Sequence, residues 1–299
     1  MAALVELKPF LPEHGALFLE YQSHRRAHSE LAHSGFAPHL IWSDLLEYRW
    51  AILEELFCLF ATSHGVTHLA LTPFGPGPIE PATVKAFEQM SRMNPAHVPS
   101  RIDNVDESSA LLLGKAGFSV AQASPDYQYL REEIVNLFGR RFHSQRSSVR
   151  RAARFHPTLR PFSRMDTADC LAVFDQWTSN PIADSVNQMM REDARFAHDA
   201  AMSGYSELGL TGRIVEVEKQ IVGYTFGFPL SQKTFCVLLE ITNRSVHGLS
   251  AWLFREFCRE LSAYTFINAM DDSGLASLSR AKALWRPVRM IPSYTVTMA

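Results

Sequence analysis

The sequence has no uncharged apolar run long enough to cross a bilayer. Its richest apolar stretch, residues 50–61, has about a dozen residues and includes Glu54 and Glu55, whereas a spanning helix needs about 20 apolar residues. The N-terminus lacks both a basic start and a small-residue cleavage site after an apolar run, so we expect no signal peptide. These absences predict a cytoplasmic protein that contacts membranes only at their surface.

Cysteines and metal-binding patterns are also scarce. The 299 residues include four cysteines, which are widely separated and lack C-x-x-C spacing: Cys58, Cys170, Cys236 and Cys258. We expect free, buried thiols in a reducing compartment. Two histidine pairs lack the H-E-x-x-H pattern of zinc proteases: His24/His28 and His64/His68. With no Walker loop and no serine nucleophile elbow either, we expect no metal site and no tightly bound cofactor.

No charge of one sign dominates, because 29 basic and 31 acidic residues give a net charge of −2. Basic residues are nevertheless concentrated after Glu133, in a segment without carboxylates. Its arginines are Arg140, Arg141, Arg146, Arg150, Arg151, Arg154 and Arg160. Helical spacing would put Arg146, Arg150 and Arg154 on one face. Such a row is suited to the phosphates of a tRNA acceptor arm or of an anionic headgroup. It is equally typical of a solvated helix paired with acids from elsewhere in the fold.

Helical and extended patterns alternate along the first half, which is typical of an α/β layer structure. Helices are predicted at 14–34, 46–64, 81–93 and 107–118. Strands are predicted at 127–130 and over about five residues that end at Pro73. The proline- and glycine-rich segment 73–78 interrupts regular structure. We place the domain boundary in the basic segment, which gives domains 1–135 and 136–299.

The second half predicts a strand meander followed by alternating elements. Helices are expected at 166–177 and 190–203, then strands at 208–218, 221–228 and 234–242. A helix at 247–261, a strand at 265–270, a helix at 274–285 and one or two strands within 288–298 complete the order. The loop after the meander resembles the pyrophosphate loop of GNAT acyltransferases in Arg244, Gly248 and Ser250, with one extra residue between Arg244 and Gly248. These residues are candidates to hold acyl-CoA at a helix N-terminus.

Four stretches together resemble the phosphatidylglycerol lysyltransferase C-terminal domain family. They are DYQYL (126–130), LFGRRFHSQRSSVRRAARF (137–155), FINAMDDSGLASLSRAK (266–282) and WRPVRMIPSYTV (285–296). The resemblance implies two tandem GNAT-like domains, each a mixed, mostly antiparallel sheet flanked by helices. It also implies kinship with enzymes that take an aminoacyl group from aminoacyl-tRNA and attach it to a lipid or a small amine or hydroxyl compound.

The sequence departs from the family pattern at three positions near its end. Met270 stands where the family usually has an acidic residue, and Ser279 stands where it usually has arginine, with Arg280 one place later. Leu284 replaces a small residue. If these positions bind the transferred group, the resemblance implies a different substrate or reduced activity.

Polar residues at the end of a predicted strand are the first catalytic candidates. Asn268, Asp271 and Asp272 follow the strand 265–270, where ligands of α/β sheets gather. A carboxylate there could orient an α-amino group or accept a proton. The alternative is an Asx turn that caps the next helix.

Glu240 and Lys282 are further candidates. Glu240 interrupts an apolar strand, where a carboxylate is costly unless it is paired or functional, so it is a candidate general base. Lys282, with Arg280, would offset charge on a phosphate or a tetrahedral oxyanion, unless it is a surface lysine. Tyr127 and Tyr129 alternate along a strand and suit aromatic packing.

The sequence thus predicts direct acyl transfer to an amine or hydroxyl acceptor. The expected donor is aminoacyl-tRNA first and acyl-CoA second. The alternative from another class is a non-catalytic binding protein that retains the fold, which Met270 and Ser279 favour.

Overall fold

The computed structural model describes residues 5–25, 29–179 and 185–298. The chain forms two compact units, unit 1 (Met1–Pro125 with Ile291–Ala299) and unit 2 (Asp126–Met290). We expected the division after residue 135; the units divide earlier, inside the strand β6 (Ser119–Leu130). The final strand, β12 (Arg289–Thr297), returns to unit 1 because it pairs with β5 (Arg101–Val105) of that unit.

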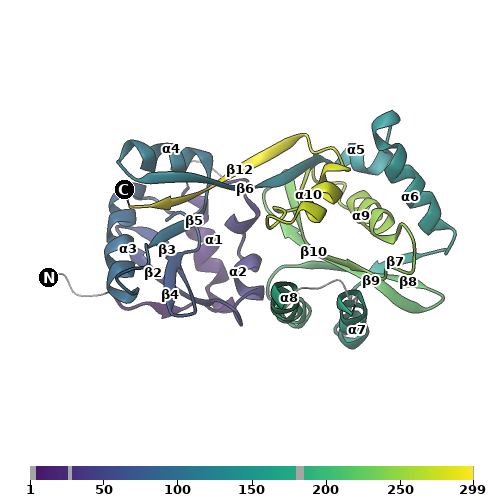
Figure 1. Cartoon of the computed structure of the whole chain (residues 1–299), viewed down its shortest axis with the longest axis horizontal. Coiled ribbons are helices and arrows are strands. Elements are labelled where there is room, and N and C mark those ends of the chain that lie inside the picture. Colours follow the sequence, from purple (N-terminus) through teal and green to yellow (C-terminus); the bar gives the residue numbers. More distant parts are fainter. Residues whose placement is uncertain (1–4, 26–28, 180–184, 299) are drawn as a thin grey trace. The chain divides into compact units, whose positions relative to one another are not determined.

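Unit 1 contains a mixed sheet with the strand order β1-β2-β3-β4-β5-β12 (Figure 1). These strands are β1 (Lys8–Pro9), β2 (Glu47–Leu53), β3 (Leu56–Ser63), β4 (Val66–Leu69), β5 (Arg101–Val105) and β12 (Arg289–Thr297). Its helices are α1 (Gly15–Ser23), α2 (Ala37–Ile41), α3 (Ile79–Met93) and α4 (Glu107–Lys115). All neighbouring pairs are antiparallel except β4 and β5.

The predicted helix at 46–64 is wrong, because this segment is the hairpin of β2 and β3. Glu54 and Glu55 form its turn with φ of 46° and 62°, the left-handed conformation that matches the twist of a two-residue hairpin. β3 is buried on both faces from Leu56 to Ala61, and an apolar run of this kind cannot be distinguished from a buried helix by periodicity. The predicted helix at 14–34 is also too long, since α1 ends at Ser23.

Unit 2 has the strand order β6-β11-β10-β9-β8-β7. Its strands are the last five residues of β6 (Ser119–Leu130) together with β7 (Thr158–Pro161), β8 (Thr211–Val217), β9 (Gln220–Pro229), β10 (Thr234–Thr242) and β11 (Phe266–Asn268). Its helices are α5 (Arg131–Asn136), α6 (His143–Ala153), α7 (Thr167–Thr178), α8 (Ser185–Ser203), α9 (Leu249–Glu260) and α10 (Ala276–Ala283). The predicted meander is confirmed as β8, β9 and β10. Figure 1 shows α7 and α8 on one face of this sheet and α9 and α10 on the other.

The neighbouring strands β10 and β11 of unit 2 pair over only part of their length. β11 runs parallel to β10 and pairs with Thr234, Phe235 and Cys236 only. β10 then carries an irregularity between Val237 and Leu239 and continues to Thr242 in register with β9. The edge of β10 that faces away from β9 therefore has no strand partner beyond Cys236 within the described residues.

An aromatic cluster forms part of the core of unit 1. The ring of Phe57, which is fully buried, stacks on Trp50 at 5.1 Å between centroids and on Phe74 at 5.2 Å. Phe10 and Phe18 pack edge-on against the same ring. One side chain of β3 thus joins the sheet, α1 and the 73–78 segment.

We expect Phe57→Ala to lower the free energy of unfolding by about 3–5 kcal/mol, because it removes a buried ring and leaves a cavity. Chemical denaturation followed by circular dichroism measures the change. Phe138→Ala is the matched control, since Phe138 is 76% exposed. Equal losses in the two variants would contradict this assignment of the core.

Candidate active site

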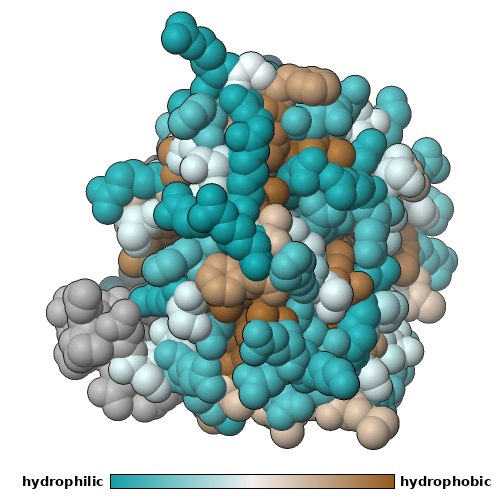
Figure 2. Space-filling view, turned by 90° about the vertical axis from the view of Figure 1, so that its right-hand side faces the viewer, coloured by the Kyte–Doolittle hydropathy of each residue, from teal (hydrophilic) through white to brown (hydrophobic). Residues whose placement is uncertain are grey.

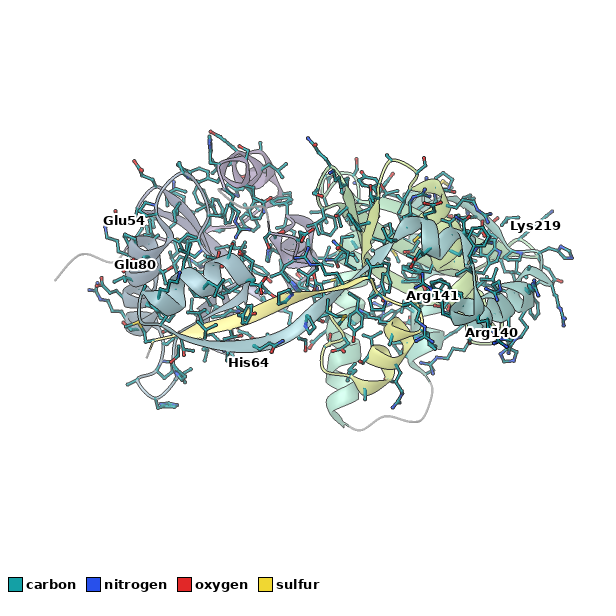
Figure 3. All side chains as sticks on the ribbon, turned by 90° about the horizontal axis from the view of Figure 1, so that it is seen from above. Glu54, His64, Glu80, Arg140, Arg141 and Lys219 are labelled. Carbon is teal, nitrogen blue, oxygen red and sulfur yellow. The ribbon has the colours of Figure 1, made fainter. Side chains whose placement is uncertain are left out.

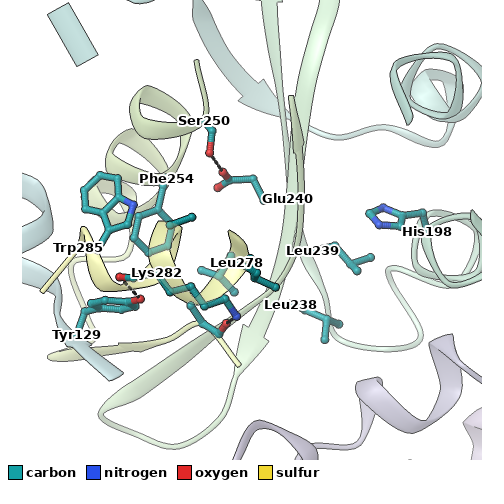
Figure 4. Close-up of a pocket in the computed structure, with 13 residues that line it drawn as sticks. Tyr129, His198, Leu238, Leu239, Glu240, Ser250, Phe254, Leu278, Lys282 and Trp285 are labelled. Carbon is teal, nitrogen blue, oxygen red and sulfur yellow. Dashed lines mark hydrogen bonds between the residues drawn. The ribbon is translucent and has the colours of Figure 1, made fainter. Parts of the chain in front are cut away.

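A cavity of about 350 Å³ lies in unit 2 where β10 and β11 diverge (Figure 4). Its wall combines apolar side chains with a few polar groups. The lining residues are Tyr129, His198, Val237, Leu238, Leu239, Glu240, Ser250, Phe254, Ala269, Leu278, Ala281, Lys282 and Trp285. The predicted residues that it brings together are Glu240, Ser250 and Lys282.

Glu240 projects from β10 toward α9 (Figure 4). Its Oε1 accepts a hydrogen bond of 2.7 Å from the Ser250 hydroxyl. Its Oε2 is buried and has no hydrogen-bond partner among the described residues. Burial raises the pKa of Glu240 to about 7, although the Ser250 hydrogen bond opposes the shift. A carboxylate that titrates near neutrality, with one oxygen unengaged beside a cavity, can accept a proton from a bound molecule.

Lys282 of α10 contributes its stem to the cavity wall, but its ammonium group is engaged elsewhere. Its Nζ donates to the carbonyl oxygens of Ala269 at 2.6 Å, of Met270 at 3.3 Å and of Asp271. Burial lowers the pKa of Lys282, and the carboxylates of Asp271 and Asp126 oppose that shift. Because an ammonium has three donors, these carbonyls leave none for a substrate oxyanion in this conformation. Lys282 fastens the segment after β11 to α10.

Asn268 lies behind the cavity and does not line it. It is fully buried, its Nδ2 donates to Asp126 Oδ2 at 2.9 Å, and its Oδ1 accepts from the Met270 amide at 2.7 Å. Met270 adopts φ of 60°, a conformation that costs energy in a residue with a Cβ. The Asn268 side chain thus holds the turn whose carbonyls receive Lys282.

Asp271 and Asp272 form Asx turns after β11 and also lie outside the cavity lining. Asp271 Oδ1 accepts from the Ser273 amide at 2.9 Å, and Asp272 Oδ1 accepts from the Gly274 amide at 3.1 Å. The Tyr127 hydroxyl donates to Asp272 Oδ2 at 2.8 Å. Burial alone would raise the pKa of Asp272, but the hydrogen bonds from Tyr127 and Gly274 lower it overall. This geometry confirms the Asx turn of the alternative but not the helix cap, because the N-cap of α10 is Leu275, which makes no side-chain capping bond.

The predicted acyl-CoA loop packs against protein. Arg244 is exposed, and its guanidinium lies 5.1 Å from the centre of the Trp177 ring. Gly248 has φ of +87°, and a Cβ there would lie 2.2 Å from the carbonyl oxygen of Ser148 on α6. The close approach of α6 to this loop thus requires glycine at position 248. Ser250, at the start of α9, instead donates its hydroxyl hydrogen to the Glu240 carboxylate.

The arginines of α6 border a surface groove of about 480 Å³. It is lined by His143, Arg146, Ser147, Arg150, Arg151 and Arg154. The guanidinium of Arg146 is partly engaged within the protein, because its Nη1 donates to the carbonyls of Gly139 at 2.6 Å and of Leu137. Arg150, Arg151 and Arg154 are exposed and form no ion pair within the described chain.

The other predicted phosphate-binding arginines do not join this groove. Arg140 is exposed near the start of α6 and Arg280 is exposed on α10. Arg160 pairs with Asp166 and Glu216. Figure 3 shows Arg140 and Arg141 at the end of unit 2 that carries α6, and Figure 2 shows mostly hydrophilic residues on that side with apolar patches between them.

His198 is a cavity residue that the sequence pattern did not reveal. It reaches the cavity from α8, on the opposite side of β10 from Glu240 (Figure 4). Its Nδ1 is 2.9 Å from the Tyr224 hydroxyl, and burial lowers its pKa to about 3, so the imidazole is neutral at physiological pH. No local signal distinguishes it from other histidines, because its partner lies on a different element.

Two absences apply to the described parts of the chain. No helix there is long and apolar enough to traverse a membrane. No group of three or more potential ligands among histidine, cysteine, aspartate and glutamate side chains could hold a metal ion there. All four cysteines are buried and free, as expected.

We expect the buried carboxylate of Glu240 to make stability depend on pH. Because its folded pKa of about 7 exceeds the ordinary value of 4.5, its stabilising contribution is complete below about pH 4.5 and is lost as pH rises through 7. Denaturation of the wild type and Glu240→Gln from pH 4.5 to 8 should therefore show a growing advantage for the variant. Glu88→Gln, at an exposed position on α3, is the control. A constant difference across this range would refute the shifted pKa.

Comparisons with known proteins identify the family and the fold. The model of the family described as "Phosphatidylglycerol lysyltransferase, C-terminal" matches residues 25–297. No curated protein matches the chain.

Three solved structures share the fold at low sequence identity. A conserved protein of unknown function from Bacteroides thetaiotaomicron is 21% identical with a TM-score of 0.86, and the match covers 99% of this chain and 100% of that one. L-PGS from Bacillus licheniformis is 13% identical with a TM-score of 0.67, over 97% and 92% of the two chains. A tandem GNAT protein from the clavulanic acid biosynthesis pathway is 8% identical with a TM-score of 0.53, over 98% of each chain.

The predicted tandem GNAT-like α/β fold is therefore confirmed. Since the family model spans nearly the whole chain, the protein belongs to the phosphatidylglycerol lysyltransferase C-terminal family.

Proposed function

We propose that unit 2 is an acyltransferase that moves an aminoacyl group from aminoacyl-tRNA to an amine or hydroxyl acceptor. The observation that carries this proposal is the cavity between β10 and β11, where Glu240 has a pKa near neutrality and an unpartnered Oε2. Kinship with the lysyltransferase family supports group transfer as the reaction class.

In the proposed reaction, the acceptor nitrogen or oxygen attacks the carbonyl carbon of the aminoacyl ester. Glu240 takes the proton that the acceptor loses. The new bond to the acceptor forms while the bond to the ribose oxygen of tRNA breaks, and the proton passes from Glu240 to that leaving oxygen. Backbone N–H groups on the unpaired edge of β10 are suited to stabilise the oxyanion, because they are fixed before the reaction begins.

The arginine groove of α6 supports tRNA as the donor. Arg150, Arg151 and Arg154 are exposed on one helix, and such a row neutralises successive phosphates. Acyl-CoA is the second candidate, but the backbone of α6 lies against Gly248 in the loop that would receive its pyrophosphate. The preference for tRNA rests on this packing. We accordingly propose a cytoplasmic location, where aminoacyl-tRNA is available.

The acceptor is either a lipid headgroup or a small molecule. Met270 and Ser279, which depart from the family pattern, belong to a closed hydrogen-bonded network: Ser279 Oγ lies 3.0 Å from the Tyr127 hydroxyl, and the Met270 amide bonds to Asn268. A non-catalytic protein with this fold is the rival function, and these two residues favour it. We favour altered specificity because the substitutions lie behind the cavity wall and leave Glu240 in place.

We expect Glu240→Gln to abolish transfer while tRNA binding persists, because the amide cannot accept the proton. The assay follows transfer from a pool of radiolabelled aminoacyl-tRNA to a pool of lipid and small-molecule amines. Ser250→Ala should retain transfer, with the midpoint of its pH–rate profile moved upward, since the hydrogen bond that lowers the pKa of Glu240 is gone. Undiminished transfer by Glu240→Gln would exclude the proposed base.

We expect charge reversal at Arg150 and Arg154 to weaken tRNA binding at least about tenfold at low salt, because two phosphate contacts are lost. Filter binding over a range of salt concentrations should also show a shallower salt dependence for the double variant. Lys115→Glu on α4 is the control, as an equally exposed basic residue of unit 1. Equal effects of the control and the double variant would argue against a tRNA site on α6.

A further inference from the structure

Unit 1 contains a cavity of its own, of about 330 Å³, beside the segment that connects β4 to α3. Most of its wall is apolar. The lining residues are Arg25, Pro73, Phe74, Gly75, Gly77, Pro78, Ile79, Glu80, Ser108, Ser109, Leu112 and Leu113. At roughly 30 Å³ for a water-sized group, the cavity holds a molecule of about ten non-hydrogen atoms.

Arg25 is a nearly buried cation with weak partners. Its side chain is 10% exposed. Its Nη2 lies 3.5 Å from the Thr72 carbonyl and 3.9 Å from Asp106 Oδ2, and the guanidinium lies 5.3 Å from the centre of the Phe74 ring. Charge-assisted hydrogen bonds of arginine are normally about 2.7–2.9 Å long. The Nε and Nη1 groups have no hydrogen bond to any residue within the described ranges.

Asp106 does not behave as a dedicated partner of Arg25. It is the N-cap of α4, and its carboxylate accepts from the Ser108 hydroxyl at 2.5 Å, from the Ser109 amide at 3.0 Å and from the Ser109 hydroxyl at 2.9 Å. Arg160 of unit 2 shows what a dedicated pair looks like, with two bonds of 2.8 Å to Asp166. The charge of Arg25 is therefore largely unmatched within the cavity wall.

Prolines leave the neighbouring loop with few backbone N–H groups. Pro73, Pro76 and Pro78 have no backbone N–H. Gly77 is packed against the β2–β3 turn, since a Cβ there would lie 2.5 Å from the Glu54 carbonyl oxygen. Arg25 is the only cationic side chain among the described lining residues.

We propose that this cavity binds a small organic monoanion, a carboxylate on an apolar body, with the carboxylate on the guanidinium of Arg25. The apolar body lies against Phe74, Ile79, Leu112 and Leu113. A planar carboxylate matches the fork of the guanidinium. Asp106 and the exposed Glu80 disfavour a phosphate dianion, because they place negative charge nearby. This site is independent of the transferase site proposed for unit 2.

Titration of the full chain with octanoate, followed by calorimetry, tests the proposal. Octylamine and octanol have the same apolar body without the negative charge. We expect octanoate to bind at least about tenfold more tightly than either, a difference of roughly one charge-assisted interaction. Glu240→Gln should bind octanoate as the wild type does, since it alters the other cavity.

Two variants make the test decisive. Arg25→Met should abolish the preference for octanoate while keeping weak binding of octanol. Leu112→Trp, at an exposed position of the cavity rim, should block all three probes without removing the charge, and it decides the matter if Arg25→Met does not fold. Absence of octanoate binding to the wild type, or binding unchanged in Leu112→Trp and in folded Arg25→Met, would overturn the proposal.

Discussion

Beyond Cys236, β10 keeps its pairing with β9 and loses its pairing with β11. A backbone edge in a sheet interior needs either another strand or something to bind. The divergence creates the cavity, and it places Glu240 on a strand whose opposite edge is fixed by β9. The carboxylate is therefore enclosed but not paired, which is the origin of its raised pKa. The chemistry proposed for unit 2 depends on this separation.

Polar residues at the end of β11 and after it fix the side of that cavity formed by Ala269 and α10. Asn268 fixes the turn at Met270, Lys282 binds the carbonyls of residues 269–271, and Asp272 joins Tyr127. Their side chains bond to backbone groups of the turn and to neighbouring side chains, so they act on a substrate only through the position of the wall. This arrangement explains how the protein can differ from its family at Met270 and Ser279 and still keep an intact cavity.

The two cavities use buried charge in different ways. In unit 2 an enclosed carboxylate is suited to exchange a proton, whereas in unit 1 an enclosed guanidinium stays charged and is suited to hold an anion. The loop between β4 and α3 is packed against its own hairpin through Gly77, and the loop between β10 and α9 is packed against α6 through Gly248. In both units, glycine serves close backbone packing, and in unit 2 this occurs in the loop that resembles the pyrophosphate loop of GNAT acyltransferases.

The sequence by itself determined the alternation of helices and strands in unit 2, the meander and the basic helix, and it marked Glu240 as a candidate base, because local periodicity and a charge within an apolar strand are visible in one dimension. It misassigned 46–64, where burial on both faces of β3 removes the alternation that marks a strand. Only the tertiary structure showed that Lys282 and Asn268 hold the turn after β11 in place beside the unit 2 cavity. It also showed that His198 lines this cavity and that Arg25 of unit 1 has no close partner among the described residues. Each of these depends on contacts between residues far apart in the chain, which no spacing rule encodes.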